Sequence, residues 1–161
     1  MKQIWAPWRT VYIGGEHGGE CIFCEKLESR EDEVNMVLLR GEKTFVLMNL
    51  FPYNNGHLLI APHRHVGEIE ELTEDEAAEL FKMTQKMIGI LRSFNPEGFN
   101  VGANIGRIAG AGVPGHFHIH VVPRWSGDTN FMPVLGNVKV ISESLEETYK
   151  KLKEALANLP R

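Results

Sequence analysis

The stretch HFHIHVV, residues 116–122, places a histidine at every second position and separates the histidines by apolar residues. Alternate side chains of a β-strand share one face, so the imidazoles are predicted to follow one another at about 6.6 Å along a strand over Phe117–Pro123. Three imidazoles on one face serve no hydrophobic core, and each can act as ligand, nucleophile or proton donor near neutral pH. The stretch therefore predicts a functional site. The alternative is a half-exposed strand with surface histidines.

A glycine-rich loop, Gly106–Gly115, leads directly into these histidines. Glycine lets main-chain amides approach a ligand closely, as they do in phosphate-binding nests. The loop has neither the Lys-Ser pair of a P-loop nor the G-x-G-x-x-G spacing of a Rossmann turn, so neither motif applies here. Surface loops are often rich in glycine, and this one gains its meaning from its position before the histidines.

Four further strands are predicted upstream of this loop. The turn residues Gly41-Glu42 separate the first two, and Asn54-Asn55-Gly56 precedes the third. The strands are expected at Met36–Arg40, Thr44–Asn49, His57–Pro62 and Gly98–Ala103. Strands joined by hairpins, with the helices set apart, indicate an α+β domain built on a five-stranded antiparallel sheet.

Two main helices are predicted, and a charge-rich segment at Glu25–Glu33 is expected to form a solvated turn or a short helix. Thr73 and Glu76 have the spacing of a capping box, and Asn95-Pro96 ends the first helix. Its expected apolar stripe is Ala77, Leu80, Phe81, Thr84, Met87, Ile88 and Leu91. The second helix is expected to start near Ser144 and to bury Leu145, Tyr149, Leu152 and Leu156.

The composition is that of one ordinary globular domain over residues 1–161. Hydrophobic residues make up 43% and charged residues 24% of the chain, and the net charge is −4. A negative net charge disfavours non-specific binding to nucleic acid, so no nucleic-acid partner is expected. No apolar run is long enough for a membrane helix, and the start MKQIWAPWRT lacks the apolar core of a signal peptide. The protein is therefore expected to be cytoplasmic and to have no membrane partner.

The two cysteines, Cys21 and Cys24, form a C-x-x-C pair. In a reducing compartment this spacing indicates half of a metal site, a redox pair or two buried thiols. A closed zinc site needs four ligands, so two would come from the seven histidines. A redox pair usually opens a helix within a βαβ pattern, and no such pattern is visible.

The histidine stretch matches the pattern of the histidine triad (HIT) family, His-φ-His-φ-His-φ-φ with φ apolar. FVLMN at 45–49 resembles the family's ribose-contacting strand, and NNGHLLIAPHRHV at 54–66 resembles its Gly-His strand and the segment after it. WAPWR at 5–9, Tyr12-Ile13, the C-x-x-C pair, AGAG at 109–112 and VVPRWSGD at 121–128 are most similar to bacterial diadenosine tetraphosphate phosphorylases. The resemblance implies a HIT-like fold and a small nucleotide substrate.

The resemblance also implies the roles of the site residues. His118 would attack the α-phosphorus of an adenylated substrate, and His120 and His57 would stabilise charge on its oxygens. Nucleotide contacts are expected from Phe45, Leu47, Asn49, Asn104, Gly110, Ala111 and Gly112. The alternative for Phe45 and Leu47 is a place in the core, and for Asn49 a turn at the strand end.

In zinc-bearing members of the family the first histidine of the triad is a metal ligand. By this resemblance Cys21, Cys24, His65 and His116 would form a closed site for structural zinc. His63 and His17 have no assigned role and are expected to be exposed.

One departure from the family bears on the reaction. Many HIT hydrolases and phosphoramidases carry a hydroxyl residue before the triad, where this chain has Val113 and Pro114. Neither side chain donates a hydrogen bond, and Pro114 also lacks a main-chain N–H. This agrees with phosphorolysis of diadenosine tetraphosphate to ATP and ADP, with inorganic phosphate as acceptor. The alternatives are a HIT hydrolase of dinucleoside polyphosphates or AMP-amidates, a zinc-stabilised nucleotide-binding module without turnover, and a thiol oxidoreductase.

The resemblance divides the domain into an amino-terminal segment (1–34), a HIT core (35–125) and a carboxy-terminal extension (126–161). It also implies a homodimer, in which Met83 and Met87 of the first helix would serve the interface or else belong to the core. Arg124, Trp125 and Asp128 follow the triad as in the phosphorylases, although a Pro-Arg-Trp turn can also be purely structural.

Overall fold

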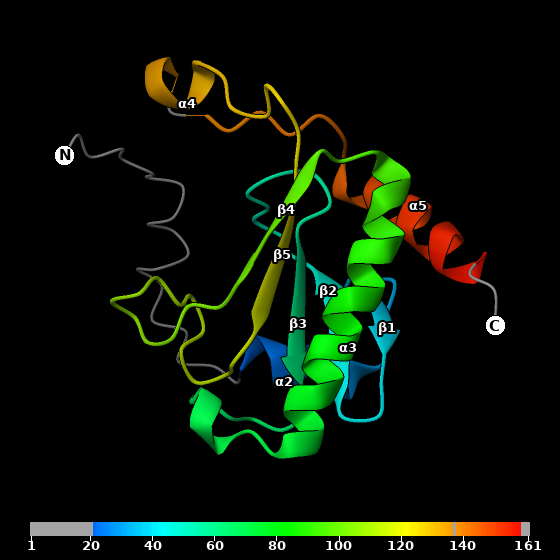
Figure 1. The fold of residues 1–161 in the computed structure, drawn as a ribbon, viewed down its shortest axis with the longest axis vertical. Coiled ribbons are helices and arrows are strands. Elements are labelled where there is room, and N and C mark those ends of the chain that lie inside the picture. The colour runs from blue at the N-terminus through cyan, green and yellow to red at the C-terminus, as the bar shows by residue number, and fades with distance from the viewer. Residues whose placement is uncertain (1–20, 137, 159–161) are drawn as a thin grey trace.

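The computed structural model describes residues 21–136 and 138–158 (Figure 1). The resemblance at residues 5–13, the glycine-rich segment 14–19 and His17 therefore lie outside the described residues. The predicted α+β architecture is confirmed within them. Five strands form one sheet in the order β1-β2-β3-β5-β4, and every neighbouring pair is antiparallel.

The strands lie close to their predicted positions. They are β1 (Val37–Arg40), β2 (Thr44–Met48), β3 (Leu58–Pro62), β4 (Gly98–Gly102) and β5 (Ile119–Arg124). The one informative difference is at β5, which was predicted to begin at Phe117. His116 and His118 precede the strand, because the main chain here pairs with a loop and not with a neighbouring strand. The N–H of Phe117 donates to the carbonyl of Val66 over 2.6 Å.

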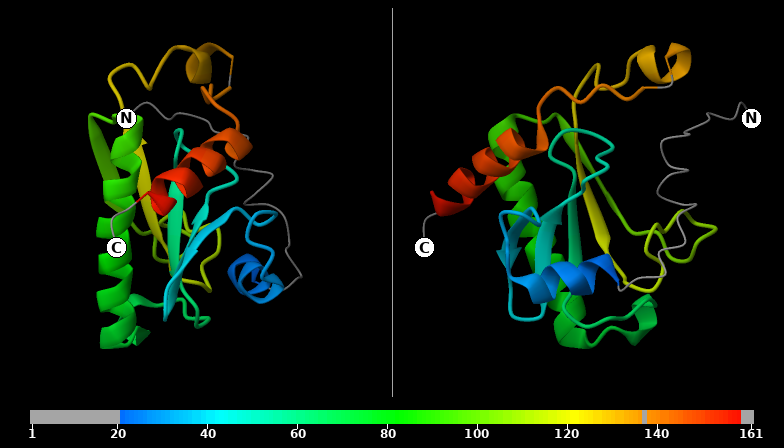
Figure 2. Two further views of the ribbon diagram at one scale, coloured as in Figure 1. Left: turned by 90° about the vertical axis from the view of Figure 1, so that its right-hand side faces the viewer. Right: turned by 180° about the vertical axis from the view of Figure 1, so that it is seen from behind.

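Helices cover both faces of the sheet (Figures 1 and 2). The long helix α3 (Glu74–Leu91) lies on one face with α5 (Leu145–Ala157) beside it, and α2 (Ile22–Ser29) lies on the other. Short helical segments occur at Ile69–Glu71, Arg92–Phe94 and Met132–Leu135, the last being α4. The segment Glu25–Glu33, predicted as a solvated turn or a short helix, contains both: its first residues belong to α2, which begins next to Cys21, and its last residues form a turn.

Helix α3 shows both a confirmed prediction and a wrong one. Thr73 and Glu76 form the predicted capping box, with both reciprocal hydrogen bonds present. Most of the predicted apolar stripe is buried, namely Leu80, Thr84, Met87 and Leu91. Ala77 is exposed and Phe81 is 65% exposed, whereas Met83, which is outside the predicted stripe, is buried in the main core. Phe81 fits the spacing but lies one position outside the buried face.

A second, smaller core lies beneath α2. Phe23 of α2 is fully buried there against strand residues on the sheet face that points away from α3. The other members of this core are Val37, Phe45, Leu47, Leu59 and Ala61. This core attaches α2 to the sheet and places it against the histidines described below.

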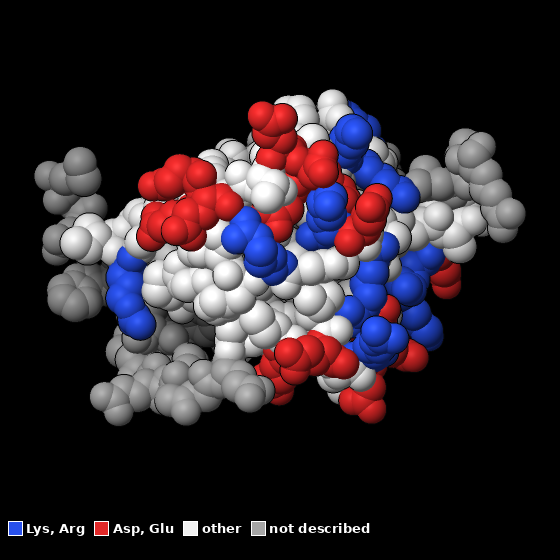
Figure 3. Space-filling model, turned by 90° about the horizontal axis from the view of Figure 1, so that it is seen from below, with Lys and Arg blue, Asp and Glu red and all other residues white. Residues whose placement is uncertain are grey.

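The charged surface carries both signs. Acidic and basic side chains are interspersed on the face seen from below (Figure 3). Among the described residues no helix is long and apolar enough to span a membrane.

Candidate functional site

His118, His120 and His57 meet at the middle of the sheet face that α2 partly covers. His120 lies on β5 opposite Leu59 of β3, and His57 directly precedes β3. The imidazole centroids of His118 and His120 are 4.9 Å apart, and those of His57 and His120 are 5.2 Å apart. The structure therefore brings the three predicted catalytic histidines together.

The hydrogen bonds assign the protons of His57 and His120. The main-chain N–H of Tyr53 donates to Nδ1 of His57 over 3.0 Å, so this nitrogen is an acceptor and the proton lies on Nε2. Nε2 of His57 is 2.9 Å from Nδ1 of His120 and donates to it. The proton of a neutral His120 then lies on its Nε2, where it can be offered to an anionic ligand.

His118 is held in the tautomer that a nucleophile needs. Its Nδ1 is 2.8 Å from the main-chain oxygen of His116 and donates to it, so Nε2 carries the lone pair. The side chain is 5% exposed, and burial lowers the pKa of His118. At neutral pH the ring is therefore uncharged and nucleophilic.

Four predicted metal ligands lie together at the start of α2. The ligand atoms of Cys21, Cys24, His65 and His116 all lie within 4.8 Å of one another. Nδ1 of His116 is 3.3 Å from Sγ of Cys21 and 3.7 Å from Sγ of Cys24, and Nδ1 of His65 is 3.4 Å from Sγ of Cys24. A zinc tetrahedron with bonds of about 2.0–2.3 Å has edges of about 3.3–3.8 Å, which these distances match.

The protonation of these ligands also suits a metal cation. Nε2 of His116 donates to the carbonyl of Pro62 over 2.9 Å, which fixes Nδ1 as the ligand atom. Burial lowers the pKa of His116 to about 4, so the ring is neutral. Burial, with the neighbouring Cys21, raises the pKa of the Cys24 thiol to about 11, so a bound cation would be needed to make it a thiolate. The donor set fits structural zinc.

Phe23 is a site residue that the sequence analysis missed. Its ring centroid lies 4.9 Å from that of His116 and 4.9 Å from that of His118. It also makes an edge-on contact with Phe45 at 6.3 Å. The only signal in the sequence is its place inside the C-x-x-C pair, which anchors α2 beside the nucleophile.

The predicted base and ribose contacts lie around this centre. Phe45 and Leu47 point to the histidine face but are 0% and 2% exposed beneath α2, so in this structure they are core residues. Asn49 is half-buried, and its Nδ2 is 3.3 Å from Nδ1 of His57. A nucleotide contact by Asn49 stays a prediction, and contacts by Phe45 and Leu47 would require movement of α2.

Several polar groups of the predicted phosphate-binding loop form hydrogen bonds within the loop itself. Asn104 Nδ2 donates to the carbonyl of Gly110 over 3.3 Å, and Gly110 adopts a φ of 99° that favours glycine. The N–H groups of Gly110 and Ala111 donate to carbonyls within the loop. That Asn104 and the N–H groups of Gly110, Ala111 and Gly112 donate hydrogen bonds to a phosphate stays a prediction.

His63 differs from expectation because it is half-buried, with its ring 6.0 Å from that of Phe45. Its Nε2 is buried and has no hydrogen-bond partner among the residues that the structure describes. Burial follows from its place directly after β3, under the end of α2.

The residues after β5 form an ordered turn. Asp128 Oδ2 accepts hydrogen bonds from Nε of Arg124 over 2.6 Å, from Nδ2 of Asn54 over 2.8 Å and from the N–H of Trp125 over 3.1 Å. The guanidinium of Arg124 holds the pKa of Asp128 well below its usual range. In this structure Arg124 and Trp125 of the Pro-Arg-Trp turn contact Asp128 within the turn, as the structural alternative expects.

Comparison with known proteins agrees with this geometry. Residues 30–127 match the HIT domain model. The chain is 37% identical to an AP-4-A phosphorylase of Mycobacterium tuberculosis, over 99% of this chain and 87% of the relative. A solved histidine triad nucleotide-binding protein of Sulfolobus tokodaii is 28% identical, with a TM-score of 0.70 over 86% of this chain and 93% of that one. A Zn-bound histidine triad protein of Mycobacterium smegmatis, 24% identical, has the same fold, with a TM-score of 0.70 over 86% of this chain and 94% of that one. The chain belongs to the HIT family.

Proposed function

We propose that this protein is an enzyme that splits diadenosine tetraphosphate with inorganic phosphate, giving ATP and ADP through an adenylyl-His118 intermediate. The observation that carries the proposal is His118 itself, since its Nδ1–H is bonded to the His116 carbonyl and its Nε2 is left nucleophilic. The proposal is supported by the M. tuberculosis relative, whose name is AP-4-A phosphorylase and which this chain matches over nearly its whole length.

In the first step Nε2 of His118 forms a bond to an α-phosphorus, and the bond from that phosphorus to the bridging oxygen breaks. The bonding pair leaves with the bridging oxygen, so ATP departs and AMP stays on the histidine. His120 and His57 would stabilise negative charge on the phosphoryl oxygens. The hydrogen bond between Nε2 of His57 and Nδ1 of His120 supports this assignment, because it leaves the proton of a neutral His120 on Nε2.

In the second step an oxygen of inorganic phosphate bonds to the same phosphorus, and the N–P bond breaks. ADP is released, and His118 regains its neutral ring. An imidazole serves both steps because it attacks readily when neutral and leaves readily from a phosphoramidate.

Phosphate is favoured over water as the acceptor by the residues before the triad. Val113 and Pro114 stand where many HIT hydrolases carry a hydroxyl donor. A HIT hydrolase acting on the same dinucleotide or on AMP-amidates would share the first step and differ only in the acceptor.

We further propose that Cys21, Cys24, His65 and His116 hold one zinc ion, which would supply a structural tie between α2 and the histidine stretch. Four protein ligands leave no open position for chemistry. The same arrangement disfavours a thiol oxidoreductase, since burial raises the pKa of Cys24 to about 11, opposite to the shift that activates a redox cysteine.

The deciding experiment is product analysis by ion-exchange chromatography, with diadenosine tetraphosphate in the presence and absence of inorganic phosphate. ATP and ADP formed only with phosphate would establish the phosphorylase. ATP and AMP formed without phosphate would identify the hydrolase, and an adenylylated protein that never clears would identify the module without turnover. Sedimentation of the same sample tests the proposed homodimer.

A further inference from the structure

A second polar pocket lies beside the histidines and is not part of the nucleotide site described above. Its volume is about 260 Å³. We call it the distal pocket, and its lining includes Tyr53, Asn100, Val122, Arg124, Thr129 and Lys139. These residues come from three separate segments of the chain.

The distal pocket adjoins the catalytic histidines through Tyr53 and β5. The ring of Tyr53 is stacked on that of His120, with centroids 5.8 Å apart and planes 9° from parallel. Val122 follows His120 by two residues on β5, so it lies on the same face about 6.6 Å further along. Asn100 of β4 is the register partner of Val122 and completes the floor. A ligand that extends from His120 along β5 therefore enters this pocket.

The charges in the distal pocket favour an anion. Arg124 is paired in a fork with Asp128, since Nε and Nη2 donate to the two carboxylate oxygens over 2.6 and 3.0 Å. Because this pair is neutral overall, the ammonium of Lys139 supplies the net charge. Lys139 donates to the main-chain oxygen of Asp128 over 2.9 Å, which uses one of its three protons.

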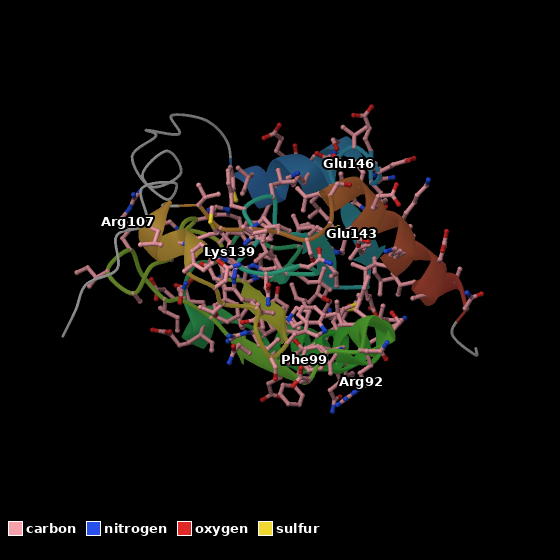
Figure 4. The ribbon with its side chains drawn as sticks, turned by 90° about the horizontal axis from the view of Figure 1, so that it is seen from above. Arg92, Phe99, Arg107, Lys139, Glu143 and Glu146 are labelled. Atoms are coloured by element: carbon pink, nitrogen blue, oxygen red, sulfur yellow. The ribbon has the colours of Figure 1, made fainter. Side chains whose placement is uncertain are left out.

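The lysine of this pocket lies outside the residues that match the HIT domain model. The family match ends at residue 127, whereas Thr129 and Lys139 belong to the carboxy-terminal extension. In Figure 4, which views the molecule from above, Lys139 lies near the centre of the view, whereas Arg107 lies at its edge. A charged side chain supplied by an extension is a means of adding specificity to a shared catalytic fold.

We propose that the distal pocket binds the phosphate chain of the departing nucleotide, with Lys139 as its specificity-determining residue. This inference rests on the proposed function, because it assumes that the leaving group is a polyphosphate. An incoming inorganic phosphate uses the same pocket, since each in-line displacement at the α-phosphorus takes place opposite His118.

The test is a binding experiment that does not require turnover. In a His118→Ala background, calorimetry compares AMP, which lacks the distal phosphates, with diadenosine tetraphosphate. Adding Lys139→Gln should weaken binding of the dinucleotide about tenfold and leave AMP binding unchanged. Lys139→Arg should restore the affinity. Lys150→Gln, an exposed lysine of α5 that does not line the pocket, is the matched control and should change neither ligand.

The outcomes separate this inference from the proposed function. The inference would be wrong if Lys139→Gln, at an unchanged melting temperature, weakened the binding of AMP and of the dinucleotide equally. It would also be wrong if the binding of neither ligand changed. Both results would leave the proposed phosphorylase reaction intact. Selective weakening of the dinucleotide by Lys139→Gln, together with no formation of ATP and ADP by the protein that retains His118, would keep the pocket and overturn the reaction.

Discussion

The Nδ1–H of His118 donates to the main-chain oxygen of His116, over 2.8 Å. The ring of His116 lies in the cysteine–histidine cluster, with Nδ1 3.3 Å from Sγ of Cys21. One residue thus links the proposed metal centre to the nucleophile: its side chain serves the first, and its carbonyl orients the second. The cysteine–histidine cluster and the reactive nitrogen are separated by few bonds, so a change in the geometry of one should affect the other.

Replacing the nucleophile should separate chemistry from binding. His118→Ala is expected to lower kcat by at least about 10³-fold, because it removes the nitrogen on which the proposed covalent intermediate forms. Nucleotide affinity should change little. Activity is measured by product formation and affinity by calorimetry, with His63→Gln as a histidine control. Near-normal turnover in His118→Ala would refute the covalent mechanism.

Removing one sulfur should release the metal. The purified protein is expected to contain one zinc per chain by elemental analysis, and Cys24→Ser should lose it. Its melting temperature should fall, because metal binding to the folded state adds to folding stability. Thiol reagent should react with the native protein only after chelation. Fast, quantitative reaction of the metal-replete protein would instead support free or redox-active thiols.

Shortening Phe23 should affect catalysis through the position of His118. Phe23→Leu removes part of a ring that lies 4.9 Å from the His118 ring, and should cost about 1 kcal/mol of stability. We expect the single-turnover adenylylation rate to fall while zinc content is kept. Phe94→Leu, on the opposite sheet face, is the control. A fall in AMP affinity at an unchanged adenylylation rate would assign Phe23 to base binding.

The capping residue Glu76 should make stability depend on acid. The hydrogen bond from Arg64 holds the pKa of Glu76 at about 2, below its ordinary value of 4.5. A depressed pKa stabilises the fold above the ordinary value, and this contribution disappears as the pH falls toward 2. Glu76→Gln should therefore cost about 1 kcal/mol at pH 7 and little at pH 2.5. Chemical denaturation at several pH values measures this.

Glu74→Gln, which alters an exposed carboxylate in the same helical turn, provides the comparison. Its effect on stability should be small across the same pH range. A constant difference between wild type and Glu76→Gln at every pH would show that the charge of Glu76 is not the cause.

Local patterns predicted the architecture well. Thr73 and Glu76 marked the start of α3 because a capping box depends only on residues three apart. The strand positions followed from apolar runs bounded by turn residues. The four metal ligands could be named because the family resemblance supplied the histidines that the C-x-x-C pair required.

The features that the sequence did not predict depend on contacts between segments that are distant in the chain. The alternation at His116–His120 predicted one straight strand, but the contacts of His116 with Pro62 and Cys21 keep it off the sheet. Phe81 satisfies helical spacing, and its exposure follows from how α3 is rotated on the sheet. The proximity of Phe23 to His118 has no counterpart in local sequence, since α2 reaches the site only through tertiary packing.

The contact between Cys21 and His116 joins positions 95 residues apart in the chain. Closing so long a loop costs more conformational entropy than forming the hairpins of the sheet, and it is expected to occur late in folding. The contacts that support the nucleophile are therefore expected to form late in folding and to open early. Loss of the metal should increase hydrogen exchange in α2 well before the five strands unfold.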